Sequence, residues 1–242
     1  MSDFIKRNED LFKVLAAFIT AQLCGALLVV LLSGLYKGYA YNILLNIVCT
    51  LALNVVVFLL FCGGIRLPQR ADGYSHIEPF MFFFAAVFLS CLAGMIVKLF
   101  PPAESTSAMP EGSALILYTA YTVVLAPVAE EVAFRGAVLT ALSRRGRFVS
   151  VLISAVVFAA YHMNLAQFPY TFVLGFFLAL LAQRSGRLLP CIMIHAANNA
   201  LTLAATYSDT VSRITDIALP VLGLVALLWL IFTGRLSGRS KR

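Results

Sequence analysis

Charged side chains are scarce in this chain: Asp, Glu, Lys and Arg make up 12% of the 242 residues, whereas 61% are hydrophobic and the mean hydropathy is +0.93. In a soluble domain about a quarter of the residues are charged. The chain therefore has too little polar surface for a water-soluble globule, which excludes a cytosolic enzyme, a disordered protein and a secreted domain held by disulfides. The five cysteines form no CxxC pair and lie in or beside apolar runs, so they are interpreted as small core residues rather than metal ligands.

Three common protease signatures are also missing from the hydrophobic part of the chain. No HExxH occurs, so the helix typical of zincin metalloproteases is absent. No two aspartates lie deep within the hydrophobic runs, as an aspartyl mechanism would need. The triplet Gly73–Tyr74–Ser75 lies in a hydrophilic connector rather than at membrane depth, which argues against a serine nucleophile.

What the sequence does contain is a series of hydrophobic runs, several of them long enough for a membrane helix. They predict about eight transmembrane helices, at Leu11–Tyr36, Asn42–Gly63, Pro79–Phe100, Ser113–Ala129, Phe148–Met163, Phe168–Gln183, Leu188–Thr206 and Ile214–Gly234. The predicted fold class is therefore all-α, a polytopic integral membrane protein. We interpret residues 1–242 as a single membrane domain, with supporting helices over 1–112, catalytic helices over 113–206, and the last helix with a basic cytoplasmic tail over 207–242.

Basic residues are distributed unevenly between the predicted connections. If both termini face the cytoplasm, fourteen of the 18 Lys and Arg residues fall on the cytoplasmic side, including a cluster at Arg144, Arg145 and Arg147. This positive-inside pattern predicts a multi-pass protein of the cell membrane with both termini in the cytoplasm. It also accounts for the net charge of +7 without nucleic acid. The basic residues are therefore expected to have membrane lipid as a partner.

In the second half, a few ionisable groups lie in the predicted spans or in the helical continuation of the fourth span, where a charge is costly and by default indicates a functional site. They are Glu130, Glu131, Arg135, His162 and His195. Arg135 follows Glu131 by four residues, the spacing of an ion pair on one helix face. Glu130 points about 100° away on a regular helix, so it can face an interior cavity as the reactive carboxylate. The helix that carries this pair should bend near Pro127 and continue to Arg145, because no Gly–Pro break follows.

The two histidines each share a helix face with a residue four positions away. Phe158 precedes His162 by one turn, and Asn199 follows His195 by one turn. Three helices would therefore present a carboxylate, two imidazoles and an amide to one interior. Such a set can activate water and stabilise an oxyanion, as in a hydrolase acting on a peptide carbonyl. Glu130, His162 and His195 could instead bind one divalent metal such as zinc, so the cofactor requirement is either none or one metal ion.

The same residues form three motifs: EExxxR from Glu130 to Arg135, FxxxH from Phe158 to His162, and HxxxN from His195 to Asn199. In this order, on successive hydrophobic segments, they resemble the CAAX protease and bacteriocin-processing family of intramembrane proteases (CPBP, formerly Abi). That family includes the type II CAAX prenyl endopeptidases. The resemblance covers roughly residues 125–201.

The resemblance implies a role for each matching position. Glu130 and His162 would activate the attacking water, and His195 and Asn199 would stabilise the oxyanion. Supporting roles are implied for Glu131, Arg135 and Phe158. The implied activity is endopeptidase cleavage of membrane-tethered substrates, which are lipid-modified and CAAX-like or carry a leader, so the implied partner is a membrane-associated peptide or protein substrate. The family has been described both as metalloendopeptidases and as metal-independent glutamate proteases, and both remain open. Alternative functions are a non-catalytic membrane scaffold or bacteriocin immunity factor and, less favoured, a proton-coupled transporter.

Overall fold

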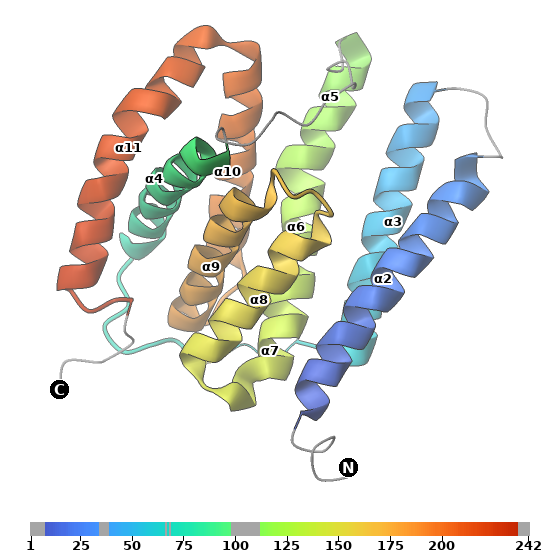
Figure 1. The fold of residues 1–242 in the computed structure, drawn as a ribbon, viewed down its shortest axis with the longest axis horizontal. Helices are drawn as coiled ribbons and strands as arrows, with labels where there is room; N and C mark the ends of the chain where they lie inside the picture. The colour runs from blue at the N-terminus through green and yellow to red at the C-terminus, as the bar shows by residue number, and fades with distance from the viewer. Residues whose placement is uncertain (1–7, 34–38, 66, 68, 98–111, 237–242) are drawn as a thin grey trace. The chain divides into compact units, whose positions relative to one another are not determined.

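The computed structural model describes residues 8–33, 39–65, 67, 69–97 and 112–236. Within these residues the chain is helical and contains no strand, so the predicted all-α class is confirmed (Figure 1). Each predicted hydrophobic run falls on a helix. The predicted ends at Tyr36 and Phe100, and the basic tail residues beyond position 236, lie outside the described part of the chain.

The described helices differ in their capacity to cross a membrane. Those long and apolar enough to do so are Glu9–Leu31, Glu78–Met95, Leu115–Arg145 and Asp209–Phe232, and shorter apolar helices lie at Ile47–Cys62 and Arg147–Tyr161. The predicted count of about eight spans is therefore not confirmed. The two helices between positions 168 and 207 carry polar side chains such as Arg184 and His195, which lower their hydropathy.

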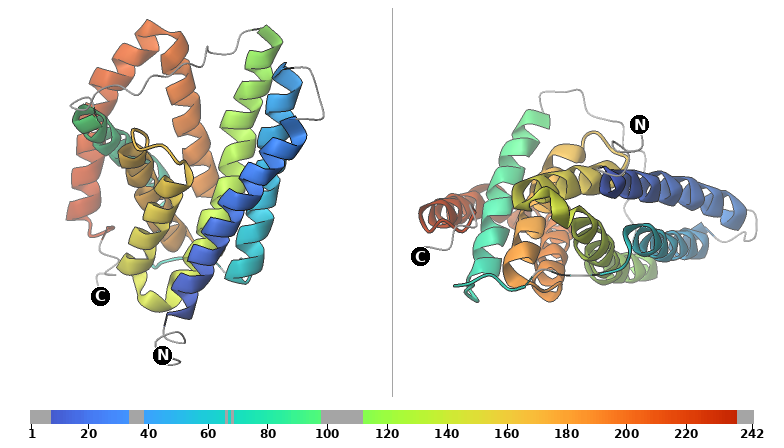
Figure 2. Two further views of the ribbon diagram at one scale, coloured as in Figure 1. Left: turned by 45° about the vertical axis from the view of Figure 1, so that its right-hand side comes forward. Right: turned by 90° about the horizontal axis from the view of Figure 1, so that it is seen from below.

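The chain forms two compact units, and the first comprises Met1–Arg66 and Met109–Ser150. In this unit α2 (Glu9–Ser33) and α3 (Tyr39–Cys62) pack along each other (Figure 2). At Gly25 an added Cβ would lie only 2.9 Å from Cγ2 of Thr50 on α3, so a small residue allows this close approach. Whether the two units together make the predicted single domain stays a prediction.

A long helical stretch completes the first unit, and its pitch changes along its length. Its parts are α5 (Gly112–Ala120), η1 (Tyr121–Leu125), α6 (Ala126–Glu131), η2 (Val132–Val138), α7 (Leu139–Ala141) and η3 (Leu142–Arg145). Both η1 and η2 are π-helical, and η3 is a 3₁₀ turn. The predicted continuation of helix to Arg145 is confirmed. The stretch ends at Gly146, whose positive φ of 80° is a backbone conformation that glycine adopts at little cost.

The second unit comprises Leu67–Ala108 and Val151–Arg242, and the chain enters it within α8 (Arg147–Tyr161). Its other helices are α4 (Glu78–Val97), α9 (Phe168–Ser185), α10 (Leu189–Tyr207) and α11 (Asp209–Phe232). Helix α4 packs most extensively against α11 and then against α9 (Figure 2). The rings of Phe82 on α4 and Phe177 on α9 meet edge to face, with centroids 6.0 Å apart.

A methyl group at Gly223 on α11 should destabilise this unit. An added Cβ would lie 2.5 Å from the Cβ of Phe88 on α4 and closer still to the carbonyl oxygen of Phe84, so α11 would have to move away from α4. We expect Gly223→Ala to lower the free energy of unfolding by about 1–3 kcal/mol, the usual cost of overpacking. Thermal or detergent-induced unfolding of the purified protein measures this loss.

Gly94→Ala is the matched control, because Gly94 lies within α4 and an added Cβ there meets no atom within 4 Å. Its stability should stay unchanged or rise slightly, since alanine favours helix over glycine. Equal losses in the two variants would contradict the close contact between α11 and α4.

Candidate active site

The carboxylate pair predicted from the sequence lies in α6, between the two π-helical segments η1 and η2. Backbone hydrogen bonds reach back five residues at the end of each π segment, from Ala126 N–H to the Tyr121 carbonyl and from Leu139 N–H to the Phe134 carbonyl. Pro127 lies in the first turn of α6, directly after η1, so the helix returns from π to α pitch at the proline, while the predicted bend stays a prediction. Such π segments are rare and often occur at functional sites.

Glu131 and Arg135 form a buried ion pair in the first unit. Nη1 of Arg135 lies 2.9 Å from Oε1 of Glu131, and both side chains are 0% exposed. The four-residue spacing predicted this contact. A charge at such depth is tolerable only when it is paired, so the two side chains depend on each other for their stability.

Glu130, the proposed reactive carboxylate, is also buried, at 9% exposure. It therefore does not lie on an open face of the helix. Phe134 lies four residues after Glu130 on the same helical stretch and is fully buried. Its ring centroid lies 5.1 Å from that of Phe58 on α3. This aromatic contact holds η2 against α3 and so helps to set the orientation of the helix that carries Glu130.

The two histidines lie in the second unit and contact the same phenyl ring. Phe158 on α8 is fully buried, and its ring centroid lies 5.0 Å from that of His162 and 5.7 Å from that of His195 on α10. Both contacts are edge to face. The spacing predicted the contact of Phe158 with His162, whereas its contact with His195 brings together helices far apart in sequence. The histidines of two motifs are thus gathered around one aromatic side chain.

The tautomer of His162 follows from its hydrogen bond. Its Nδ1 lies 2.9 Å from the carbonyl oxygen of Phe158. A carbonyl oxygen can only accept, so Nδ1 carries the hydrogen and Nε2 keeps a lone pair in the neutral ring. This is the tautomer that a general base needs. The next residue, Met163, has a φ of 49°, and among the described residues no other non-glycine residue has a positive φ, so backbone strain is stored beside this histidine.

The remaining motif residues lie on α10. His195 is 2% exposed, and Asn199 lies one turn later and is half-buried. Nδ2 of Asn198 donates a long hydrogen bond, 3.5 Å, to Oδ1 of Asn199. The neighbouring amide therefore engages the acceptor end of Asn199 and orients its NH₂ group.

The predicted site residues are thus divided between the two units. Glu130, Glu131 and Arg135 belong to the first unit, and the residues of the other two motifs belong to the second. Convergence of the carboxylate with the two imidazoles stays a prediction.

The metal-binding alternative requires three ligands at one point. In the part of the chain that the structure describes, no three or more His, Cys, Asp or Glu side chains are grouped so that they could hold a metal ion. The Nδ1 atom of His162 is occupied by a backbone carbonyl, which leaves Nε2 as the ring nitrogen that could bind a metal. Glu130 belongs to the first unit and the two histidines to the second, so these three residues as a metal site stay a prediction, and no step is derived through a metal.

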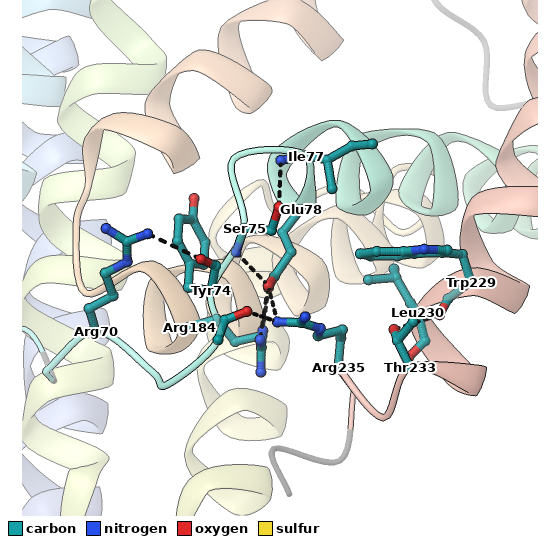
Figure 3. A network of polar contacts seen from close by, with 11 residues as sticks. Arg70, Tyr74, Ser75, Ile77, Glu78, Arg184, Trp229, Leu230, Thr233 and Arg235 are labelled. Atoms are coloured by element: carbon teal, nitrogen blue, oxygen red, sulfur yellow. Dashed lines mark hydrogen bonds and ion pairs between the residues drawn. The ribbon is translucent and has the colours of Figure 1, made fainter. Parts of the chain in front are cut away.

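A polar cluster around Glu78 was not predicted from the sequence (Figure 3). This carboxylate is fully buried at the start of α4 and accepts hydrogen bonds from Nη2 of Arg184 at 2.9 Å and from Nη1 of Arg235 at 2.6 Å. It also accepts from the backbone N–H of Ser75 at 3.0 Å. The cluster ties the beginning of α4 to the end of α9 and to the residues after α11.

One local signal could have revealed this cluster. Ser75 and Glu78 match the capping-box pattern SxxE before an apolar run, in which the glutamate accepts from the backbone at the helix start. The side chain of Tyr74 lies beside this cluster. Its burial raises the pKa of its phenol, and the negative charge of Glu78 raises this pKa further. The two arginines come from distant parts of the chain, so no spacing rule predicts them.

Comparison with known families supports a protease. Residues 112–201 match the family model described as "Type II CAAX prenyl endopeptidase Rce1-like". This segment contains all three motifs, so the resemblance recognised from them is confirmed over these residues. The family is also one of membrane proteins, in agreement with the apolar helices. No curated protein and no solved structure gives a significant match to the chain.

Proposed function

We propose that the protein is an intramembrane endopeptidase that hydrolyses peptide bonds in membrane-tethered substrates. The observation that carries the proposal is the family match over residues 112–201, which contains the three motifs in order. The substrate class is lipid-modified, CAAX-like C-termini or leader-bearing peptides. The setting is the cell membrane, with several passes and both termini in the cytoplasm, because the basic residues concentrate on one side of the predicted connections.

Water activation is assigned to Glu130 and His162. The Nε2 lone pair of His162 takes a proton from water while the water oxygen forms a bond to the peptide carbonyl carbon. The carboxylate of Glu130 accepts a hydrogen bond from the same water and stabilises the positive charge that develops on the ring as the proton moves. The imidazolium then returns the proton to the leaving nitrogen, and the C–N bond breaks.

Oxyanion stabilisation is assigned to His195 and Asn199. The carbonyl oxygen gains negative charge when water adds, and donors already in position stabilise this charge more than the ground state. The contact from Asn198 engages Oδ1 of Asn199, which supports the use of its NH₂ group as a donor. Phe158 holds the rings of His162 and His195 and is a positioning residue.

Replacing the proposed base with an amide tests this assignment. In proteoliposomes with a membrane-tethered peptide substrate, His162→Gln should lower kcat by about 10²–10⁴-fold, the usual contribution of general base catalysis. His76→Gln is the matched control, because His76 lies exposed in the connector before α4 and should leave kcat unchanged. Unfolding of all three proteins is measured in parallel.

Equal activity in the wild type and His162→Gln would overturn the assignment. No cleavage of any membrane-tethered peptide by the wild type, together with a partner or phenotype that survives His162→Gln, would instead favour the scaffold or immunity function. The same assay with and without a chelator separates direct activation of water from a metal-dependent route.

A further inference from the structure

The first unit contains a cavity of about 730 Å³ that the proposed protease mechanism does not use. It lies where α2 begins, α3 ends and η3 leads into α8, and all of its lining residues belong to this unit. A volume of this order is typical of ligand sites. Five charged side chains line the cavity: Glu9, Asp10, Lys13, Arg144 and Arg145.

The charges in this cavity do not balance. Arg145 holds Asp10 with two hydrogen bonds, Nε to Oδ2 and Nη2 to Oδ1, both 2.7 Å long. Lys13 pairs with Glu9 at 2.6 Å, but both side chains are about half-exposed, so this pair is weak and can exchange for another partner. Arg144 is exposed and interacts with Glu9 electrostatically, but no ion pair within the described part of the chain includes it. One positive charge therefore remains for a ligand.

The cavity lining also includes apolar side chains. Val149 lines the cavity and is exposed, and its neighbour Phe148 is exposed as well. Cys62, at the end of the apolar helix α3, also lines it. A cationic recess beside exposed apolar side chains at the end of membrane helices matches a phospholipid, with its phosphate in the recess and its acyl chains along the helices.

We propose that this cavity binds the phosphate of an anionic phospholipid through Arg144, with Lys13 as a second donor. The basic residues at this end are those that the positive-inside pattern assigns to the cytoplasmic leaflet, where anionic lipids are found. The guanidinium offers several N–H donors in one plane and suits a phosphate group better than a single ammonium. The proposal does not depend on the peptidase activity.

Binding of fluorescent phosphatidylglycerol to the full chain in phosphatidylcholine nanodiscs tests the site. Arg144→Gln should weaken binding by about tenfold or more, as loss of a hydrogen bond to a charged group does. Arg187→Gln is the matched control, because Arg187 is exposed, lies on the same predicted side of the membrane and does not line the cavity. It should change binding by less than about twofold.

A second variant tests whether the lipid occupies the volume of the cavity, without changing the charge of its lining. Ala141→Phe keeps every charge but fills part of the cavity, which Ala141 lines, so it should also weaken phosphatidylglycerol binding. Equal losses in Arg144→Gln and Arg187→Gln would overturn the proposal in favour of diffuse attraction to the surface. Undiminished binding in Ala141→Phe, or full competition by inorganic phosphate, would overturn it as well, because neither fits a lipid seated in this cavity.

Discussion

Glu130→Gln should abolish peptide cleavage while the protein still inserts and folds. Glutamine keeps nearly the same shape as glutamate but cannot carry the negative charge that the mechanism assigns to Glu130. We expect kcat to fall by about 10³-fold or more, because the water and the imidazolium both lose their charged partner. The fold should persist, since a neutral amide at a position only 9% exposed is less costly to bury than a carboxylate.

Glu9→Gln is the matched control for this experiment. Glu9 lies in the same unit, but its side chain is about half-exposed and pairs with Lys13. The control should cleave substrate at the wild-type rate, and both variants should unfold at the wild-type temperature. An unchanged kcat in Glu130→Gln would show that Glu130 does not take part in peptide hydrolysis, whatever the activity of variants at other carboxylates.

Glu131→Gln should act mainly on stability. It leaves the guanidinium of Arg135 buried at 0% exposure without its carboxylate, and breaking a buried pair in this way costs about 3–5 kcal/mol. The loss is measured as a fall in unfolding temperature or in resistance to detergent. The fraction that remains folded should retain its kcat, because the pair is assigned a supporting role.

Removing both charges tests whether the loss of stability in Glu131→Gln comes from the unpaired Arg135. The double variant Glu131→Met with Arg135→Met should regain much of the stability lost in Glu131→Gln, since apolar residues of similar volume often replace a buried ion pair without loss. If Glu131→Gln instead abolishes cleavage at unchanged stability, then Glu131 and Glu130 must exchange roles. A double variant as unstable as the single one would show that other groups depend on these charges.

Local spacing accounts for the parts of the site that the sequence predicted correctly. The contacts of Glu131 with Arg135 and of Phe158 with His162 each join residues four apart on one helical stretch. Geometry over a single turn varies little between proteins, so such contacts can be read from residue order. The change of pitch around Glu130 was not predicted, because residue spacing describes contacts only on a regular helix. Whether a π segment forms depends on tertiary packing as well as on residue type.

The sequence by itself predicted a helical chain with apolar runs of membrane length and a motif set that resembles that of intramembrane proteases, because hydropathy and motif spacing are properties of the chain alone. The tertiary structure decided that two histidines from different helices contact Phe158, and that Glu78 collects two distant arginines. It also decided the π-helical context of the glutamates and the charged cavity beside Arg144. These features depend on which helix faces meet, and that choice is made by the packing of many side chains together rather than by any local pattern.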